Sequence, residues 1–153
     1  MTIAIEQLEL KELQAFLREQ AEDSFPDLKD EERLTMLSEK WHSYAEICTC
    51  RNDIGQLVGM IAFYANQPDG RVAYIPHVYV KRELRGKSIF KMMFYEIVMF
   101  LKKNGFKRVR LEVNNNNLNA RRAYSAMGFH IDGAAGAHST FMVYFICDND
   151  NVY

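Results

Sequence analysis

The sequence predicts a mixed α/β (α+β) domain with a central, mostly antiparallel sheet of about seven strands, about four flanking helices and one splayed parallel strand pair. Apolar residues alternate in several short segments and recur every three or four positions in others, so both strands and helices are expected. Three strand-like segments follow one another with only turns between them, which makes them antiparallel. A long helical segment then leads to a further strand, and this crossover gives a parallel pair.

The N-terminal part is expected to form a strand and two helices. Residues 2–6 alternate weakly and predict the strand, and residues 9–22 predict an amphipathic helix. Pro26 disfavours a helical conformation at the residue before it, so the first helix ends before this position. A second helix is expected over residues 29–41, with Leu34, Leu37 and Trp41 on its buried face.

Three antiparallel strands should follow the two helices. Residues 44–51, 56–65 and 71–80 are rich in β-branched and aromatic residues. The turns between them are Asn-Asp-Ile-Gly at 52–55 and Asn-Gln-Pro-Asp-Gly at 66–70, and both are strong turn sequences.

The C-terminal part is expected to contain two helices and three strands. Residues 88–104 place their apolar side chains on one face and end at Asn104-Gly105, which suits a left-handed helix cap. Residues 108–113 form the parallel strand. Residues 118–127 form a short helix, capped by Asn117 and ended by Gly128. The last two strands are expected at 129–132 and 140–146.

Length and composition indicate one domain over residues 1–153, large enough to bury a core without disulfides. The N-terminal residues lack the basic and apolar regions of a signal peptide, and the longest apolar run is too short to span a membrane, so a cytoplasmic protein is expected. The net charge of -1 gives no general attraction to nucleic acid. Cys48 and Cys50 share a strand face and Cys147 stands alone, which indicates neither a disulfide framework nor a metal site.

A basic loop, Lys81-Arg-Glu-Leu-Arg-Gly-Lys87, connects an apolar strand to the long helix. The free N–H groups and the dipole of a helix N-terminus favour an anion at such a place. By itself the loop could equally be a solvated turn, and the helix that follows it favours phosphate binding.

Two segments resemble the Gcn5-related N-acetyltransferase (GNAT) superfamily. In this family a strand ending in Val leads to a loop of the form Gln/Arg-x-x-Gly-x-Gly/Ala, and Val80 is followed here at the same spacing by Arg85-Gly86-Lys87-Ser88-Ile89-Phe90. Two residues depart from this pattern: Ser88 stands in place of a glycine, and Phe90 stands in place of a glycine or alanine. Ser88 can serve as an N-cap residue of the helix, and Phe90 is expected to face the core. Downstream, every fixed position of the family pattern Asn-x-x-Ala-x-x-x-Tyr-x-x-x-Gly-Phe is matched, by Asn117, Ala120, Tyr124, Gly128 and Phe129.

The resemblance implies acetyl-CoA as cofactor. The backbone of Val78, Tyr79 and Val80 would pair with the pantetheine arm as an added strand would. The pyrophosphate would be held by the amides of Arg85, Gly86, Lys87, Ser88, Ile89 and Phe90, together with the Arg85 and Lys87 side chains. Asn117 and Ala120 would complete the coenzyme site, although a helix cap alone also explains Asn117.

The resemblance further implies Tyr124 as general acid, because a phenol on a short helix can donate its proton to the departing sulfur. The alternative is a buried aromatic side chain. His77 could accept a proton from the amine, directly or through water, because its pKa lies near neutrality. It alternates with Ile75 and Tyr79 on one strand face, so a hydrogen-bonded structural histidine is equally compatible with the sequence.

The expected function is transfer of an acetyl group from acetyl-CoA to a primary amine of a small molecule or of a peptide or protein. The acids Glu22, Asp23 and Asp27 lie where the acceptor should bind and would favour a cationic amine. The alternative is a catalytically silent GNAT-fold sensor or regulatory domain that binds coenzyme A. Nucleic acid and membrane are not expected partners, and the sequence leaves a homodimer open.

Overall fold

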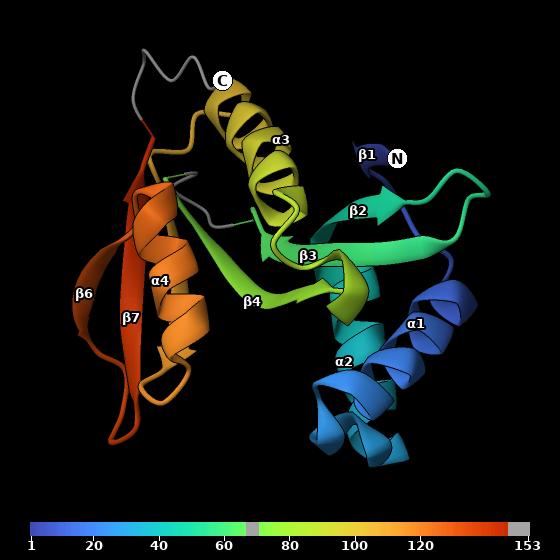
Figure 1. Ribbon diagram of the computed structural model, residues 1–153. Helices are drawn as coiled ribbons and strands as arrows, with labels where there is room; N and C mark the ends of the chain where they lie inside the picture. The colour runs from blue at the N-terminus through green and yellow to red at the C-terminus, as the bar shows by residue number, and fades with distance from the viewer. Residues whose placement is uncertain (67–70, 147–153) are drawn as a thin grey trace. The chain divides into compact units, whose positions relative to one another are not determined.

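The structure is a computed structural model of the chain that describes residues 1–66 and 71–146. Its strands form a seven-stranded sheet in the order β1-β2-β3-β4-β5-β7-β6 (Figure 1). The strands are β1 (Thr2–Ile5), β2 (Glu46–Arg51), β3 (Leu57–Tyr64), β4 (Val72–Val80), β5 (Arg108–Asn114), β6 (His130–Ala134) and β7 (Ser139–Phe145). The helices are α1 (Leu10–Asp23), α2 (Glu31–Tyr44), α3 (Ile89–Lys103) and α4 (Leu118–Met127), with 3₁₀ turns η1 (Pro26–Lys29) and η2 (Arg82–Leu84).

The predicted fold class is confirmed. β4 and β5 form the parallel pair, and the other pairings given for the described strands are antiparallel. The predicted elements are all found, with boundaries that differ by no more than three residues. Residues 67–70 of the predicted turn at 66–70 and Cys147 lie outside the described residues.

The chain forms two compact units. The first comprises Met1–Phe63 and His77–Ile97, and the second comprises Tyr64–Pro76 and Val98–Tyr153. β4 and α3 each run from one unit into the other, so each unit has its own part of these elements.

In the first unit, α1 and α2 lie side by side (Figure 1) and α1 packs on one face of the strands. Gln20 of α1 donates a hydrogen bond to the sulfur of Met60 at 3.3 Å. α3 lies on the other face, where a Cβ on Gly59 would be 3.2 Å from Met93. This arrangement follows from the alternation of side chains along a strand, which sends Met60 and Gly59 to opposite faces.

The second unit contains the start of β4, the end of α3, and β5, α4, β6 and β7. β5 pairs with β7 from Arg108↔Phe145 to Asn114↔Ser139. Within this unit the buried strand residues are Ala73, Ile75, Val109, Leu111, Val113, Met142 and Val143. The end of α4 packs on this sheet, because a Cβ on Gly128 would lie 3.3 Å from the ring of Tyr144.

Across the described ranges 1–66 and 71–146, no helix combines the length and the apolar character that crossing a bilayer requires.

Candidate functional site

The basic loop (residues 81–88) enters α3 with unused amide groups. The first helical hydrogen bond runs from the N–H of Met92 to the carbonyl of Ser88 at 3.0 Å. Within the described part of the chain, the N–H groups of Gly86, Lys87, Ser88 and Ile89 have no backbone acceptor. Residues 85–88 are exposed. A run of free amides at a helix N-terminus is suited to an anion.

Two residues of the basic loop have left-handed backbone conformations. Gly86 has a φ of 79°, and Ser88 has a φ of 65°. Among the described residues, Ser88 is the non-glycine residue with positive φ, which costs about 1–2 kcal/mol for a residue with a Cβ. Ser88 therefore takes the conformation that suits the glycine of the family pattern. The sequence argument placed Ser88 correctly at the helix start but missed this conformation.

Phe90 lies in the first turn of α3 and is half-buried. Its ring stacks on that of Phe94, with centroids 6.1 Å apart and an interplanar angle of 25°. Phe94 itself is 1% exposed. Phe90 is therefore less enclosed than Phe94, the next aromatic residue along the helix.

The side chain of Arg85 binds the protein itself. Its guanidinium donates to the carbonyl of Val80 at 2.8 Å, to Asp23 Oδ2 at 3.0 Å and to Ser24 Oγ at 2.7 Å. These three bonds engage the fork of the guanidinium, so an anion at the loop meets backbone amides and the exposed Lys87 rather than a free Arg85.

Asp23, the last residue of α1, collects three donors. The hydroxyl of Tyr79 donates to Oδ2 at 2.7 Å, and Arg82 Nε donates to Oδ1 at 3.0 Å, in addition to the bond from Arg85. The hydrogen bond from Tyr79, together with the two arginines, lowers the pKa of Asp23. Burial and the Asp23 carboxylate raise the pKa of Tyr79. The Asp23 carboxylate therefore connects α1 to β4 and to the basic loop through hydrogen bonds.

His77 of β4 is enclosed by aromatic side chains. Its Nε2 lies 2.6 Å from Gln20 Oε1, and its ring is 4.5 Å from Phe25 and 4.8 Å from Trp41, measured between centroids. Burial lowers the pKa of His77 to about 4, so the ring is neutral at pH 7 and Nε2 donates to Gln20. The sequence analysis left two roles open for His77, a general base and a hydrogen-bonded structural histidine. These contacts fit the structural role.

The acids near the end of α1 are paired within the chain. Glu22 lies 3.8 Å from Lys29, and Asp27 lies 2.9 Å from Arg33. Together with Asp23, each of the three acids expected to attract a cationic amine has a cation beside it.

The parallel pairing of β4 is short. It runs from Val72↔Arg108 to Ile75↔Leu111, and β4 continues to Val80. The segment Val78–Val80, expected to contact the pantetheine arm, lies beyond this pairing. On the side of β3, the N–H of Lys81 donates to the carbonyl of Val58 at 2.9 Å, which anchors the start of the basic loop.

The second motif (residues 117–129) forms the predicted capped helix. The side chain of Asn117 accepts a hydrogen bond from the N–H of Ala120 at 3.2 Å. Gly128 ends α4 with a φ of 107°, and the N–H of Phe129 donates to the carbonyl of Tyr124 at 3.0 Å. The fixed positions of this motif thus set both ends of α4.

Tyr124 is half-buried, with its ring centroid 5.6 Å from that of Phe129. Burial raises the pKa of Tyr124 to about 12. The phenol therefore keeps its proton at neutral pH, as a proton donor must.

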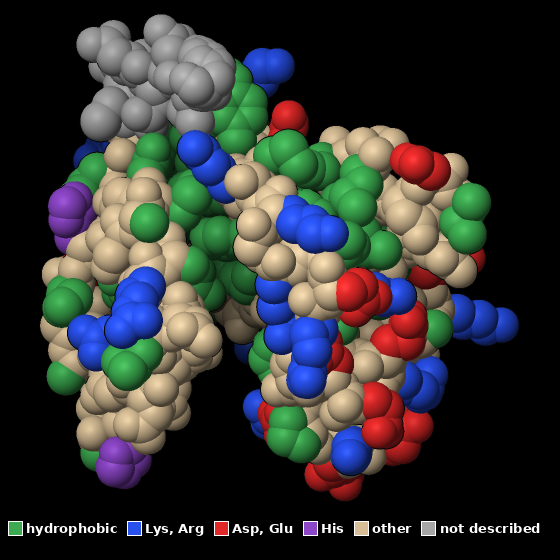
Figure 2. Space-filling model, viewed as in Figure 1, with side chains coloured by type: hydrophobic (Ala, Val, Ile, Leu, Met, Phe, Trp, Pro, Cys, Tyr) green, Lys and Arg blue, Asp and Glu red, His purple; other side chains and the backbone are tan. Residues whose placement is uncertain are grey.

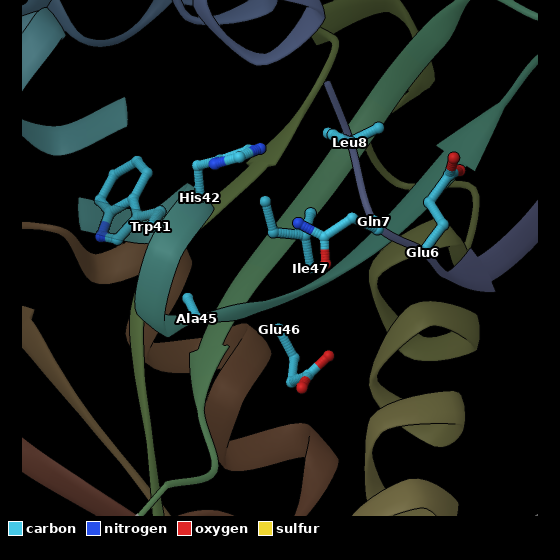
Figure 3. Close-up of a pocket in the computed structure, with 8 residues that line it drawn as sticks. All are labelled: Glu6, Gln7, Leu8, Trp41, His42, Ala45, Glu46 and Ile47. Atoms are coloured by element: carbon cyan, nitrogen blue, oxygen red, sulfur yellow. The ribbon is translucent and has the colours of Figure 1, made fainter. Parts of the chain in front are cut away.

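A small pocket in the first unit lies apart from both motifs in sequence. Figure 3 shows Trp41 and His42 from the end of α2, and Glu46 and Ile47 from β2. The other lining residues are Glu6, Gln7, Leu8 and Ala45. Nowhere in the described ranges do three His, Cys, Asp or Glu side chains gather in a group that could hold a metal ion.

Charged side chains of both signs are mixed on the surface. On the face drawn in Figure 2, acidic and basic side chains lie beside one another over α1 and α2. Over α1 and α2 on this face, the mixture differs from the uniformly basic stripe that nucleic-acid-binding domains present.

Sequence reasoning missed how Asp23 and Gln20 are used. The sequence analysis assigned Asp23 to the attraction of a cationic amine, although an acid in the last turn of a helix opposes the helix dipole and is stabilised by a cation nearby. The last turn of α1 contains no basic residue. This was the one available signal that Asp23 has partners elsewhere in the chain. Gln20 gave no such signal.

Comparison with known proteins gives a family and a fold. A model of the Acetyltransferase (GNAT) family matches residues 10–129. A search of curated proteins gives no significant match. The solved structures that resemble this one include the PaiA N-acetyltransferase of Thermoplasma acidophilum in complex with coenzyme A. It has a TM-score of 0.74 and 20% identity, over 95% of this chain and 99% of that one.

Two further structures have the same fold at lower identity. A GNAT-family acetyltransferase of Staphylococcus aureus Mu50 has a TM-score of 0.75 and 16% identity, over 95% of this chain and 100% of that one. An aminoglycoside 6′-N-acetyltransferase complexed with coenzyme A has a TM-score of 0.74 and 12% identity, over 96% of this chain and 98% of that one.

Proposed function

We propose that this chain, which belongs to the Acetyltransferase (GNAT) family, is an N-acetyltransferase that transfers the acetyl group of acetyl-CoA to a primary amine. The observation that carries the proposal is the run of free amides from Gly86 to Ile89 at the start of α3. This run lies at the position where the family pattern places the pyrophosphate.

The residues of the basic loop fit a diphosphate. Residues 86–88 are exposed, and left-handed conformations such as those of Gly86 and Ser88 occur in the backbone turns that bind anions through successive N–H groups. Lys87 adds a positive charge, while Arg85 holds the loop. The backbone of Val78–Val80, beyond the parallel pairing, would take the pantetheine arm.

Bound acetyl-CoA would supply an acetyl thioester, which is the activated acyl group. The N–H of Val78 would polarise the thioester carbonyl as an oxyanion-hole donor does. Tyr124 would give its proton to the sulfur, because burial keeps the phenol protonated. Asn117 and Ala120 would position the start of α4, where the side chain of Asn117 accepts from Ala120.

The proton from the amine needs an acceptor, and His77 is a weak candidate for a direct role. A base with a pKa of about 4 holds a proton poorly at pH 7. Its imidazole is also hydrogen-bonded to Gln20 at 2.6 Å. We therefore propose that the amine binds in its neutral form or loses its proton through water, with His77 holding β4 against α1.

A small-molecule amine is the acceptor that the comparisons favour, because one structural neighbour is named as an aminoglycoside acetyltransferase. A peptide or protein amine is the second acceptor class. The paired acids at the end of α1 leave little free negative charge to select a highly cationic acceptor.

A second candidate function is a coenzyme A-binding sensor without catalysis. The low pKa of His77 favours it, because this removes the one basic group that the sequence offered. The sensor would keep the amides of the basic loop and bind the coenzyme without transferring its acetyl group.

Two measurements separate these functions. Isothermal titration with acetyl-CoA tests the coenzyme site, and absence of binding would eliminate both candidates. Thiol release is then followed across a panel that contains an aminoglycoside, a polyamine and an N-terminal peptide amine. Amine-dependent release supports the transferase, whereas binding without release for any amine supports the sensor.

A further inference from the structure

We infer that Asp23 is a positioning residue for the donor site: its carboxylate fastens the basic loop to the end of α1 and so holds the loop amides ready for an anion. The inference rests on the proposed function, because the anion concerned is the diphosphate of the donor.

The contacts of Asp23 reach both sides of the basic loop. Arg82 and Arg85 bracket the 3₁₀ turn η2, and each places a guanidinium nitrogen 2.8–3.0 Å from an oxygen of Asp23. Arg82 also donates to the backbone carbonyl of Asp23 at 3.0 Å. Both carboxylate oxygens are used, and the side chain is only 16% exposed. The side chains of Arg82 and Arg85 are 71% and 43% exposed, so the restraint comes from the number of charge-assisted donors on one half-buried carboxylate rather than from burial of the pairs.

The position of Asp23 in its helix has no local benefit. A carboxylate in the last turn of a helix faces the negative end of the dipole, and the last turn of α1 offers no basic residue to compensate. The compensation comes from Arg82 and Arg85, which lie about 60 residues further along the chain. The geometry therefore assigns Asp23 to the loop rather than to the helix.

Arg85 transmits the restraint to the amides. Its Nε donates to the carbonyl of Val80, the residue just before the loop, and its Nη2 donates to Asp23. The guanidinium therefore connects the start of the loop to the end of α1. Gly86 follows directly, with the first of the two left-handed conformations. Fixing Arg85 from two directions limits the rotation of the free amides that begin at Gly86. An anion then binds without ordering the loop, which improves affinity through preorganisation.

The same carboxylate accepts a hydrogen bond from Tyr79 of β4, which has a second and independent anchor. Tyr79 donates to Asp23 at 2.7 Å, and its ring packs edge-on against Phe16 with centroids 5.5 Å apart. Loss of the carboxylate would therefore loosen the loop while Tyr79 stays held by its ring packing. The predicted damage is confined to the basic loop.

The test uses Asp23→Asn, which keeps the shape and removes the charge, and Arg85→Lys, which keeps the charge and removes the fork. Glu22→Gln is the matched control, because Glu22 is the preceding residue of α1 and its carboxylate pairs with Lys29 at 3.8 Å. Amide hydrogen exchange without ligand is measured at positions 84, 85 and 92, whose N–H groups donate to the carbonyls of Lys81, Arg82 and Ser88, and the affinity for coenzyme A is measured by isothermal titration.

We expect both variants to exchange about tenfold faster at positions 84, 85 and 92 and to bind coenzyme A about tenfold more weakly. The KM for acetyl-CoA should rise in proportion, with kcat and the KM for the amine within about twofold of the parent. The double variant should lose little more affinity for coenzyme A than either single variant, because both substitutions disrupt the same interaction between Asp23 and Arg85. Glu22→Gln should match the parent in hydrogen exchange of the loop and in affinity for coenzyme A.

Loop exchange equal to that of Glu22→Gln, or faster exchange spread over the whole first unit, would overturn the inference. If Asp23→Asn fails to fold, Arg85→Lys decides by the same criteria. If the parent binds no coenzyme A, the proposed function fails, and the exchange of the ligand-free loop still decides whether Asp23 holds the amides.

Discussion

The basic loop (residues 81–88) offers backbone amides, whereas the second motif (residues 117–129) uses side chains and close packing. The loop differs from the family pattern at Ser88, and its backbone still takes the left-handed conformation there. The second motif matches at every fixed position, and Asn117 and Gly128 each have a contact that needs that residue. A segment that acts through its backbone tolerates substitution at a conformational cost, and a segment that acts through side chains does not.

The largest expected effect concerns His77 of β4, which is packed against Gln20, Phe25 and Trp41. Below pH 6.5 the unfolded chain binds a proton at His77, and the folded chain does so only near pH 4. The free energy of unfolding should therefore fall by up to about 3 kcal/mol as the pH falls from 6.5 to 4.

Urea unfolding of the parent and of His77→Gln at several pH values measures this effect. The glutamine variant should lose the contribution of His77 to the slope between pH 6.5 and 4. The exposed His130→Gln serves as control and should unfold with the slope of the parent. Equal slopes for the parent and His77→Gln would mean that the pKa of His77 in the folded protein stays near its ordinary value of about 6.5, so that the neutral ring could act as a base at pH 7.

The next largest effect concerns Tyr124 of the second motif. Tyr124→Phe should lower kcat about 10²-fold, because removal of a general acid costs about this much. The KM for acetyl-CoA should change little. Tyr144→Phe is the control, because Tyr144 belongs to the same aromatic cluster, with its ring centroid 5.6 Å from that of Phe129. Steady-state thiol release measures both variants, and a parental rate for Tyr124→Phe would show that solvent protonates the sulfur.

A pair of glycine substitutions compares the two segments directly. Gly86 and Gly128 both have positive φ, but only at Gly128 would a Cβ meet another group within 4 Å, the ring of Tyr144. Gly128→Ala should therefore destabilise the protein by about 2 kcal/mol, and Gly86→Ala by about 1 kcal/mol, which is the conformational cost alone. Thermal and urea unfolding give both values. A larger loss for Gly86→Ala would contradict the distinction between the segments.

The fold was predictable because its signals are local. Apolar periodicity located the helices, and the crossover from residue 80 to residue 108 set the parallel pair. Asn117 and Gly128 defined α4 without error, since caps act within a few residues.

The candidate site was less predictable because its contacts are distant in sequence. The sequence assigned Arg85 to the phosphate, whereas its side chain binds Asp23 and Ser24, which lie more than 60 residues away. The burial of His77 depends on Phe25 and Trp41 in the same way. Local patterns cannot show which partner a long polar side chain will reach.

The smallest expected effect tests whether the basic loop acts through its backbone. Ser88→Gly removes the strain of a φ of 65°, while the greater freedom of glycine in the unfolded chain offsets part of the gain. The net result should be a stabilisation of up to about 1 kcal/mol with unchanged affinity for coenzyme A. Ser88→Ala keeps the strain and removes the hydroxyl, so its stability and affinity should equal those of the parent. Weaker coenzyme binding by both variants would show that the hydroxyl of Ser88 contacts the donor, and the loop would then resemble the second motif in depending on a side chain.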